Sequence, residues 1–187
     1  MALTRINNQA LTNVTSAGLP TLNSDKLPSG TVLQVKQAVQ EGRLTLTSSS
    51  YTTVSGLSVS ITPKSTSSKI LVTVNIEGSG NDRYNAFRLY RGSTAIGIGD
   101  AGSGSEERMS FSFDSNQSAG DDNYVNHNAG ITYLDSPSTT SSTTYSLKFR
   151  RTHGSGTFYL NRPVYIDTGY AYTRYSISSI TVMEIAG

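Results

Sequence analysis

The sequence predicts an all-β protein: a single antiparallel β-sandwich, jelly-roll-like, that follows an extended N-terminal arm. Three observations predict this fold class. Several short segments alternate apolar and polar residues with a period of two, which is typical of strands with one buried face. Turns rich in Gly, Ser and Asn separate these segments, and eleven Tyr together with many Thr, Val and Ile favour strands. No segment has the apolar stripe of a helix, and many short strands of this kind indicate a sandwich or barrel.

The clearest strand covers residues 70–76, where Ile and Val side chains alternate with Leu, Thr and Asn. Its four alternate residues are expected to share one buried face, and they are Ile70, Val72, Val74 and Ile76. The same reasoning predicts strands at 31–40, 54–61, 70–76, 87–90, 94–96, 109–113, 129–133, 145–150, 158–160 and 177–185.

The composition is that of one ordinary domain. At 187 residues the chain is long enough for a single core, and we divide it into an arm over residues 1–30 and a head over residues 31–187. It contains no Cys, so strand pairing and apolar burial must hold the fold together. Only 35% of the residues are hydrophobic, but a net charge of +2 is too small for the signature of a disordered chain.

Charge and hydropathy argue against two classes of partner. The 15 Lys and Arg are set against 13 Asp and Glu, and the densest basic pair is Arg150-Arg151, so no concentrated basic face for nucleic acid is expected. No apolar run is long enough to span a bilayer, and the opening residues 1–8 lack the apolar stretch of a signal peptide. We therefore expect no nucleic-acid partner, no membrane partner and no passage through the usual secretory route.

The arm carries single apolar residues among polar ones, without a period of 2 or 3.6. Pro20 and Pro28 stop helices and favour extended chain. Such a segment cannot form a core of its own, so it is either a floppy terminus or a segment that docks into pockets of a partner. The candidate partner-binding residues of the arm are Leu3, Ile6, Leu11, Val14, Leu19 and Leu22.

Nothing in the sequence predicts an active site. The two histidines, His127 in an Asn-rich loop and His153 in a turn, are more typical of solvated surface residues than of a catalytic pair. No Gly-x-Ser-x-Gly elbow precedes a helix, because no helix is expected. We therefore expect a protein that is not an enzyme and has no catalytic residue.

Two motifs bear on ligands. The residues Asp121-Asp122-Asn123 could supply oxygen ligands to a hard cation, but their spacing departs from an EF-hand loop and a solvated turn explains them better. The spacing of the glycines in residues 96–102 resembles that of a dinucleotide-binding loop. That site requires a helix after the loop, and no helix is expected here, so we reject this match. We expect neither a metal nor a cofactor.

One cluster of aromatic residues precedes the last predicted strand. Tyr with Arg is the composition of interface anchors, because both supply large contact area with a polar tip. The alternative is that the tyrosines cap the edge of the sandwich, half-buried with wet hydroxyls, and stacking on carbohydrate is a third interpretation. The candidate subunit or receptor contacts are Tyr165, Tyr170, Tyr172, Arg174 and Tyr175.

Four segments of the head carry a resemblance to known proteins, and they are residues 61–72, 87–92, 133–137 and 178–186. Through these segments the head resembles a group of virion-associated proteins encoded by marine tailed bacteriophages, over roughly residues 31–187. The opening Met1–Thr4 also looks like the short anchors that begin many phage fibre and decoration proteins.

The resemblance implies a structural protein of the virion, assembled in the host cytoplasm. The preferred role is a capsid decoration or cement protein attached to other virion proteins by its arm. The alternative is a short tail fibre or fibre tip that binds the host surface, where a glycan would be the partner. The resemblance also implies a homotrimer, and it supplies no catalytic residue. A glycan-degrading spike would need paired carboxylates in a cleft, and the acidic residues fall mostly in predicted turns.

Overall fold

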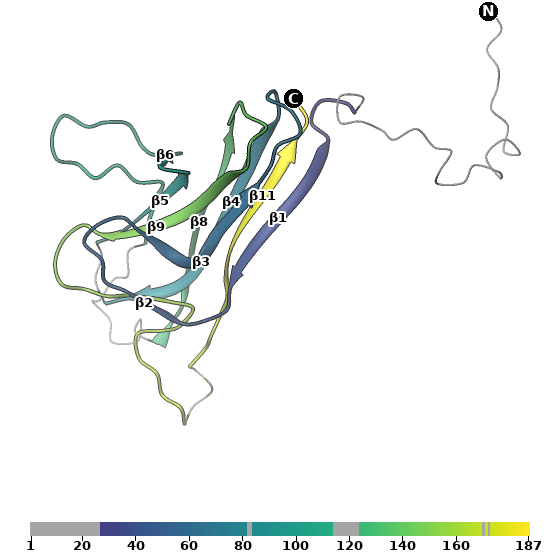
Figure 1. Ribbon diagram of the computed structural model, residues 1–187. Helices are drawn as coiled ribbons and strands as arrows, with labels where there is room; N and C mark the ends of the chain where they lie inside the picture. Colours follow the sequence, from purple (N-terminus) through teal and green to yellow (C-terminus); the bar gives the residue numbers. More distant parts are fainter. Residues whose placement is uncertain (1–26, 82–83, 114–123, 170, 172) are drawn as a thin grey trace, which may run out of the picture.

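Two antiparallel sheets pack face to face in the computed structural model of the chain (Figure 1). The structure describes residues 27–81, 84–113, 124–169, 171 and 173–187. Within these residues it contains eleven strands and no helix, which confirms the predicted all-β sandwich. All six candidate arm residues, from Leu3 to Leu22, lie outside the described residues, so their docking stays a prediction.

The first sheet has the order β1-β11-β4-β10-β2, and β8 also pairs with β4. Every pairing in this sheet is antiparallel. Its strand β1 lies at the edge of this order, with only β11 as its hydrogen-bonded neighbour among the described strands. The strands of this sheet are β1 (Val32–Gln40), β2 (Leu44–Leu46), β4 (Lys69–Gly80), β8 (His127–Asp135), β10 (Phe158–Leu160) and β11 (Ser178–Ile185).

The second sheet has the order β3-β9-β5-β6, and β7 also pairs with β5. The chain passes repeatedly from one sheet to the other, so that β1-β11-β4-β8 faces β3-β9-β5-β7 in a jelly-roll-like order. The strands of the second sheet are β3 (Thr52–Ile61), β5 (Asn85–Arg91), β6 (Thr94–Ile96), β7 (Phe111–Phe113) and β9 (Thr143–Arg151).

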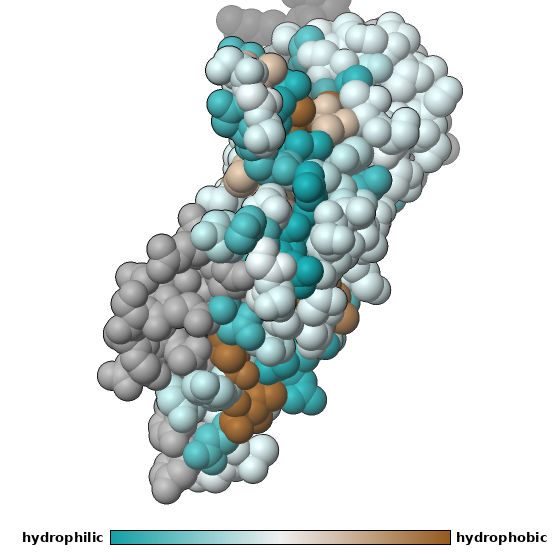
Figure 2. Space-filling model, turned by 90° about the vertical axis from the view of Figure 1, so that its left-hand side faces the viewer, coloured by the Kyte–Doolittle hydropathy of each residue, from teal (hydrophilic) through white to brown (hydrophobic). Residues whose placement is uncertain are grey.

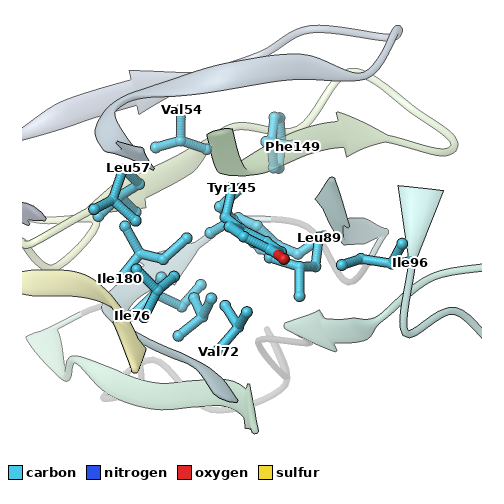
Figure 3. Packing of buried hydrophobic residues seen from close by; sticks show 14 of the residues in the cluster. Val54, Leu57, Val72, Ile76, Leu89, Ile96, Tyr145, Phe149 and Ile180 are labelled. Carbon is cyan, nitrogen blue, oxygen red and sulfur yellow. The ribbon is translucent and has the colours of Figure 1, made fainter. Parts of the chain in front are cut away.

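The core forms where the inner faces of the two sheets meet (Figure 3). The four alternate residues of β4, Ile70, Val72, Val74 and Ile76, are each at most 2% exposed, which confirms their predicted buried face. An aromatic group fills one part of this core, since the ring of Phe87 lies 5.1 Å from that of Phe111 and 5.3 Å from that of Phe158. Such ring pairs add to the stabilisation that area burial supplies.

Each predicted strand is present, with its ends shifted by a few residues, but two details of the prediction were wrong. The strand β2 was missed, because only Leu44 and Leu46 mark it and three residues are too few for a pattern. His127 does not lie in a loop: it begins β8, where its backbone pairs with that of Gly78. The pairing with β4 extends β8 past the apolar residues that predicted it.

The two ends of the sandwich differ. At one end the arm joins β1, and the amide of Gly30 donates to the carbonyl oxygen of Ala186 at 2.8 Å. The amide of Ala186 donates in turn to the carbonyl oxygen of Thr31 at 2.8 Å. The segment between β10 and β11, residues 161–177, lies at the opposite end, at the bottom of Figure 1.

Candidate interaction surfaces

The outer face of the first sheet carries an apolar row that crosses four adjacent strands. Val35 of β1 pairs with Met183 of β11, Met183 pairs with Leu71 of β4, and Leu71 pairs with Leu134 of β8. The side chains of Val35 and Leu134 are 52% and 54% exposed. Because paired residues of neighbouring strands point to the same face, these four side chains form one continuous surface.

A second pair of apolar residues extends this surface toward the end of the sheet where the arm joins β1. Val32 pairs with Ile185, and Val32 is exposed. We call the six residues together the apolar strip, and they are Val32, Val35, Leu71, Leu134, Met183 and Ile185.

Polar side chains bound the apolar strip on its other side. The next outer row runs from Gln37 through Thr181 and Thr73 to Thr132. The amide Nε2 of Gln37 donates to the hydroxyl Oγ1 of Thr181 at 2.9 Å. The outer face therefore changes from apolar to polar side chains between two neighbouring rows. This limits the apolar strip to the end of the sheet where the arm joins β1.

The predicted tyrosine cluster lies at the opposite end, in the segment between β10 and β11. Tyr165 and Tyr175 are 54% and 52% exposed, so each ring is about half-buried. The guanidinium of Arg43 lies 4.8 Å from the ring centre of Tyr175, and its Nη1 donates to the tyrosine hydroxyl at 3.2 Å. The ring of Tyr165 lies 5.6 Å from that of Tyr124.

The structure places the other members of that cluster in part. The side chain of Arg174 is exposed, and its carbonyl oxygen accepts a hydrogen bond from Asn126 Nδ2 at 3.0 Å. Tyr170 and Tyr172 lie outside the described residues. Exposed apolar residues adjoin the cluster at this end, among them Ile166 and Ile177, and Figure 2 shows apolar side chains exposed at the same level of the molecule.

A charged cluster that sequence reasoning missed lies on the outer face of the second sheet. Glu107 accepts hydrogen bonds from Arg88 Nη2 at 2.7 Å, from Arg150 Nη1 at 2.8 Å and from the hydroxyl of Tyr51 at 2.6 Å. The guanidinium of Arg88 also stacks over the ring of Tyr51, 4.1 Å from its centre. Beside it, Lys148 Nζ lies 4.0 Å from the ring centre of Tyr90.

This cluster fixes the long loop between β6 and β7 to the sheet. Glu107 lies near the end of that loop, four residues before β7 begins at Phe111, whereas Arg88 and Arg150 belong to β5 and β9. Glu107 was predicted only as part of a charged turn before a strand, because nothing in the local sequence shows that two arginines of other strands lie beneath it. Figure 2 shows hydrophilic side chains in a band down this side of the molecule. Because the one carboxylate pairs with guanidinium groups of two strands, the arrangement holds the loop against the sheet.

Two tyrosine hydroxyls, those of the buried Tyr145 and the partly buried Tyr51, make the stability of the fold fall at alkaline pH. Burial, followed by a hydrogen bond to Glu107, raises the pKa of Tyr51 above its ordinary 10.0. Burial and the hydrogen bond to Asp135 likewise raise the pKa of Tyr145. Each hydroxyl therefore holds its proton more tightly in the folded chain than in the unfolded chain.

The stability that these protons supply is complete below the unfolded-state pKa and falls as pH rises above it. We expect the urea midpoint of unfolding to decrease as pH rises above about 10. The variant Tyr145→Phe should show a smaller decrease over the same interval, because it has lost one of the two groups. An equal slope in the variant and the parent would contradict the role of Tyr145.

Within the residues that the structure describes, no group of three or more His, Asp or Glu side chains could hold a metal ion. Asp121 and Asp122 lie outside those residues. The described residues include no helix long and apolar enough to cross a membrane. His153 lies beside Tyr84, with 5.0 Å between the ring centres, and the other histidine, His127, lies 6.2 Å from the ring of Phe113.

Comparisons with known proteins do not assign the chain to a family. No protein-family model matches it, and no curated protein matches it significantly. The fold and the surfaces described above are therefore the basis for a function.

Proposed function

We propose that the chain is a structural protein of a tailed-phage virion, a capsid decoration or cement protein that is attached by its N-terminal arm and is not an enzyme. The observation that carries this proposal is that the two ends of the head differ. Residues 27–31, through which the arm joins the head, lie at the same end as the apolar strip, and the exposed tyrosines Tyr165 and Tyr175 lie at the other end. A protein that attaches by one end and projects the other needs this arrangement.

The way in which the arm joins the head suits a protein that is held to a particle by its arm. The strand β1 continues the arm directly and pairs with β11 from Val32 to Gln40. The strand β11 is itself paired with the central strand β4 over seven residue pairs, from Ser179 to Ile185. A pull on the arm would therefore act along β1 and be shared by many backbone hydrogen bonds of the sheet.

Deletion of residues 1–26 tests the proposal. The deletion leaves the hydrogen bonds of Gly30 and Thr31 to Ala186 in place, so the head should stay folded and soluble. Supplied to virions that lack the protein, the truncated chain should fail to incorporate. A matched control keeps the full length but replaces each apolar arm residue, from Leu3 to Leu22, with Ser, and it should also fail. Wild-type incorporation of the truncated chain would show that the head alone attaches.

A short tail fibre or fibre tip is the second candidate function. Exposed rings with nearby arginines, as at Tyr175 and Arg43, favour contact with a host surface, for example with a glycan that stacks on an aromatic ring. The number of copies per virion separates the two roles. Hundreds of copies would indicate decoration, and a few dozen or fewer would indicate a tail component. A homotrimer remains part of either proposal.

A further inference from the structure

The apolar strip is a surface that an isolated sheet rarely leaves open. It combines exposed hydrocarbon with the free edge of β1, a nine-residue strand that pairs with β11 alone among the described strands. An edge strand of this length with exposed valines invites another strand or an apolar segment to cover it. The partner that covers it can be inferred from the chain immediately before β1.

A tight turn immediately before β1 reverses the direction of the chain. The amide of Thr31 donates to the carbonyl oxygen of Pro28 at 3.1 Å, which closes a four-residue β-turn. Gly30, the third residue of the turn, has φ of +89°, a left-handed value that favours Gly at this position of a type II turn. The chain that precedes Pro28 is therefore directed back toward β1.

Only one side of β1 is open to the returning chain. Residues 30 and 31 are bonded to Ala186 on the β11 side, and the inner face of the sheet is filled by the core. In Figure 1 the segment before β1 bends to the side of β1 that is away from β11. The free edge and the outer face are what remains, and there Val32, Val35 and Val39 are 50%, 52% and 41% exposed.

The length and composition of residues 1–26 also suit a segment that covers the apolar strip. Twenty-six residues precede Leu27, and an extended chain reaches about 3.3 Å per residue, whereas four strands are roughly 15 Å wide. The segment has isolated apolar residues and few charges, namely Arg5, Asp25 and Lys26. Because it is tethered beside the strip, its effective concentration there exceeds that of any free partner.

We propose that residues 1–26 fold back over the apolar strip of their own copy while the protein is free. Under the proposed function, on which this inference rests, attachment to the particle withdraws the arm from the strip. Until assembly, the apolar side chains of the arm would then be covered by the apolar strip of the head and would not be exposed.

Thiol labelling of the purified protein tests this inference without any particle. The chain has no Cys, so the variant Leu134→Cys introduces a single thiol on the strip, at a side chain that is 54% exposed in the head. We expect a maleimide to label this thiol at least about tenfold faster after deletion of residues 1–26 than in the full chain, which corresponds to about 1.4 kcal/mol of protection. The full-length chain with its apolar arm residues replaced by Ser should label as fast as the truncated one.

The matched control is Ser58→Cys, on the exposed face of the other sheet, and its labelling rate should not change with the deletion. Equal rates for Leu134→Cys in the full and truncated chains would overturn the inference. Protection that appears only as the protein self-associates with rising concentration would also overturn it, because the occupant would then be another copy. Failure of either kind leaves the incorporation assay, and with it the proposed attachment by the arm, unaffected.

Discussion

Replacement of Val74 with Asp is expected to abolish folding. Val74 is 2% exposed on β4, and its backbone pairs with Ile180 on one side and Ile131 on the other. The side chains of the surrounding core cluster are almost wholly hydrocarbon. A carboxyl group there must either lose its hydration as an ion or take up a proton, and in both cases its polar oxygens have no partner. That cost is comparable with the roughly 5–15 kcal/mol by which small domains are stable.

The control for this variant is Thr132→Asp, which adds the same charge on the exposed outer face of the same sheet. It should change the free energy of unfolding by only about 0.5 kcal/mol. Far-UV circular dichroism and the elution volume in gel filtration distinguish a folded from an unfolded chain. If the Val74→Asp protein were folded and melted near the parent, the assignment of the buried face of β4 would be wrong.

The layering of the head could be predicted because its physical cause is local. Side chains of a strand alternate between two faces, so burial of one face imposes a period of two that any single segment displays. Residues 70–76 and 145–150 both show this period, and both lie where it predicts, in β4 and β9. The strand β2 has no such period to display, because its three residues are held by pairing with β10 rather than by a pattern of their own.

The apolar strip could not be predicted, because its cause is the register between strands distant in the sequence. Leu71 and Met183 each stand at a position whose side chain points away from the core, where the alternation predicts a polar residue. An apolar residue at such a position is the only sign of the strip within one strand. That they adjoin each other, and adjoin Val35 and Leu134, follows from which strands pair and with what offset. The same holds for Glu107, whose two arginine partners belong to strands 19 and 43 residues away.

A second large loss of stability is expected when Asp135, the last residue of β8, is replaced. Asp135 is 4% exposed, and its oxygens accept hydrogen bonds from Arg91 Nη1 at 2.8 and 3.0 Å and from the hydroxyl of Tyr145 at 2.7 Å. Replacement with Ala leaves a buried hydroxyl without its acceptor and a guanidinium without its counter-charge. We expect a loss of about 2–4 kcal/mol in the free energy of unfolding, measured by urea titration. This is less than the cost of breaking a fully buried charged pair, because the side chain of Arg91 is 31% exposed and keeps part of its hydration.

The double variant Asp135→Ala, Tyr145→Phe separates the two parts of that cost. Tyr145→Phe alone removes one hydrogen bond and the hydroxyl together, so it should cost only about 1 kcal/mol. In the double variant no hydroxyl is left without an acceptor, and the loss should be smaller than the sum of the two single losses by about 1–3 kcal/mol, the cost of a buried unsatisfied group. Strict additivity would mean that water reaches the tyrosine hydroxyl once Asp135 is gone. The Nη1 of Arg91 also donates to the carbonyl oxygen of Ser136 at 3.3 Å, so the guanidinium keeps this partner in each of the three variants.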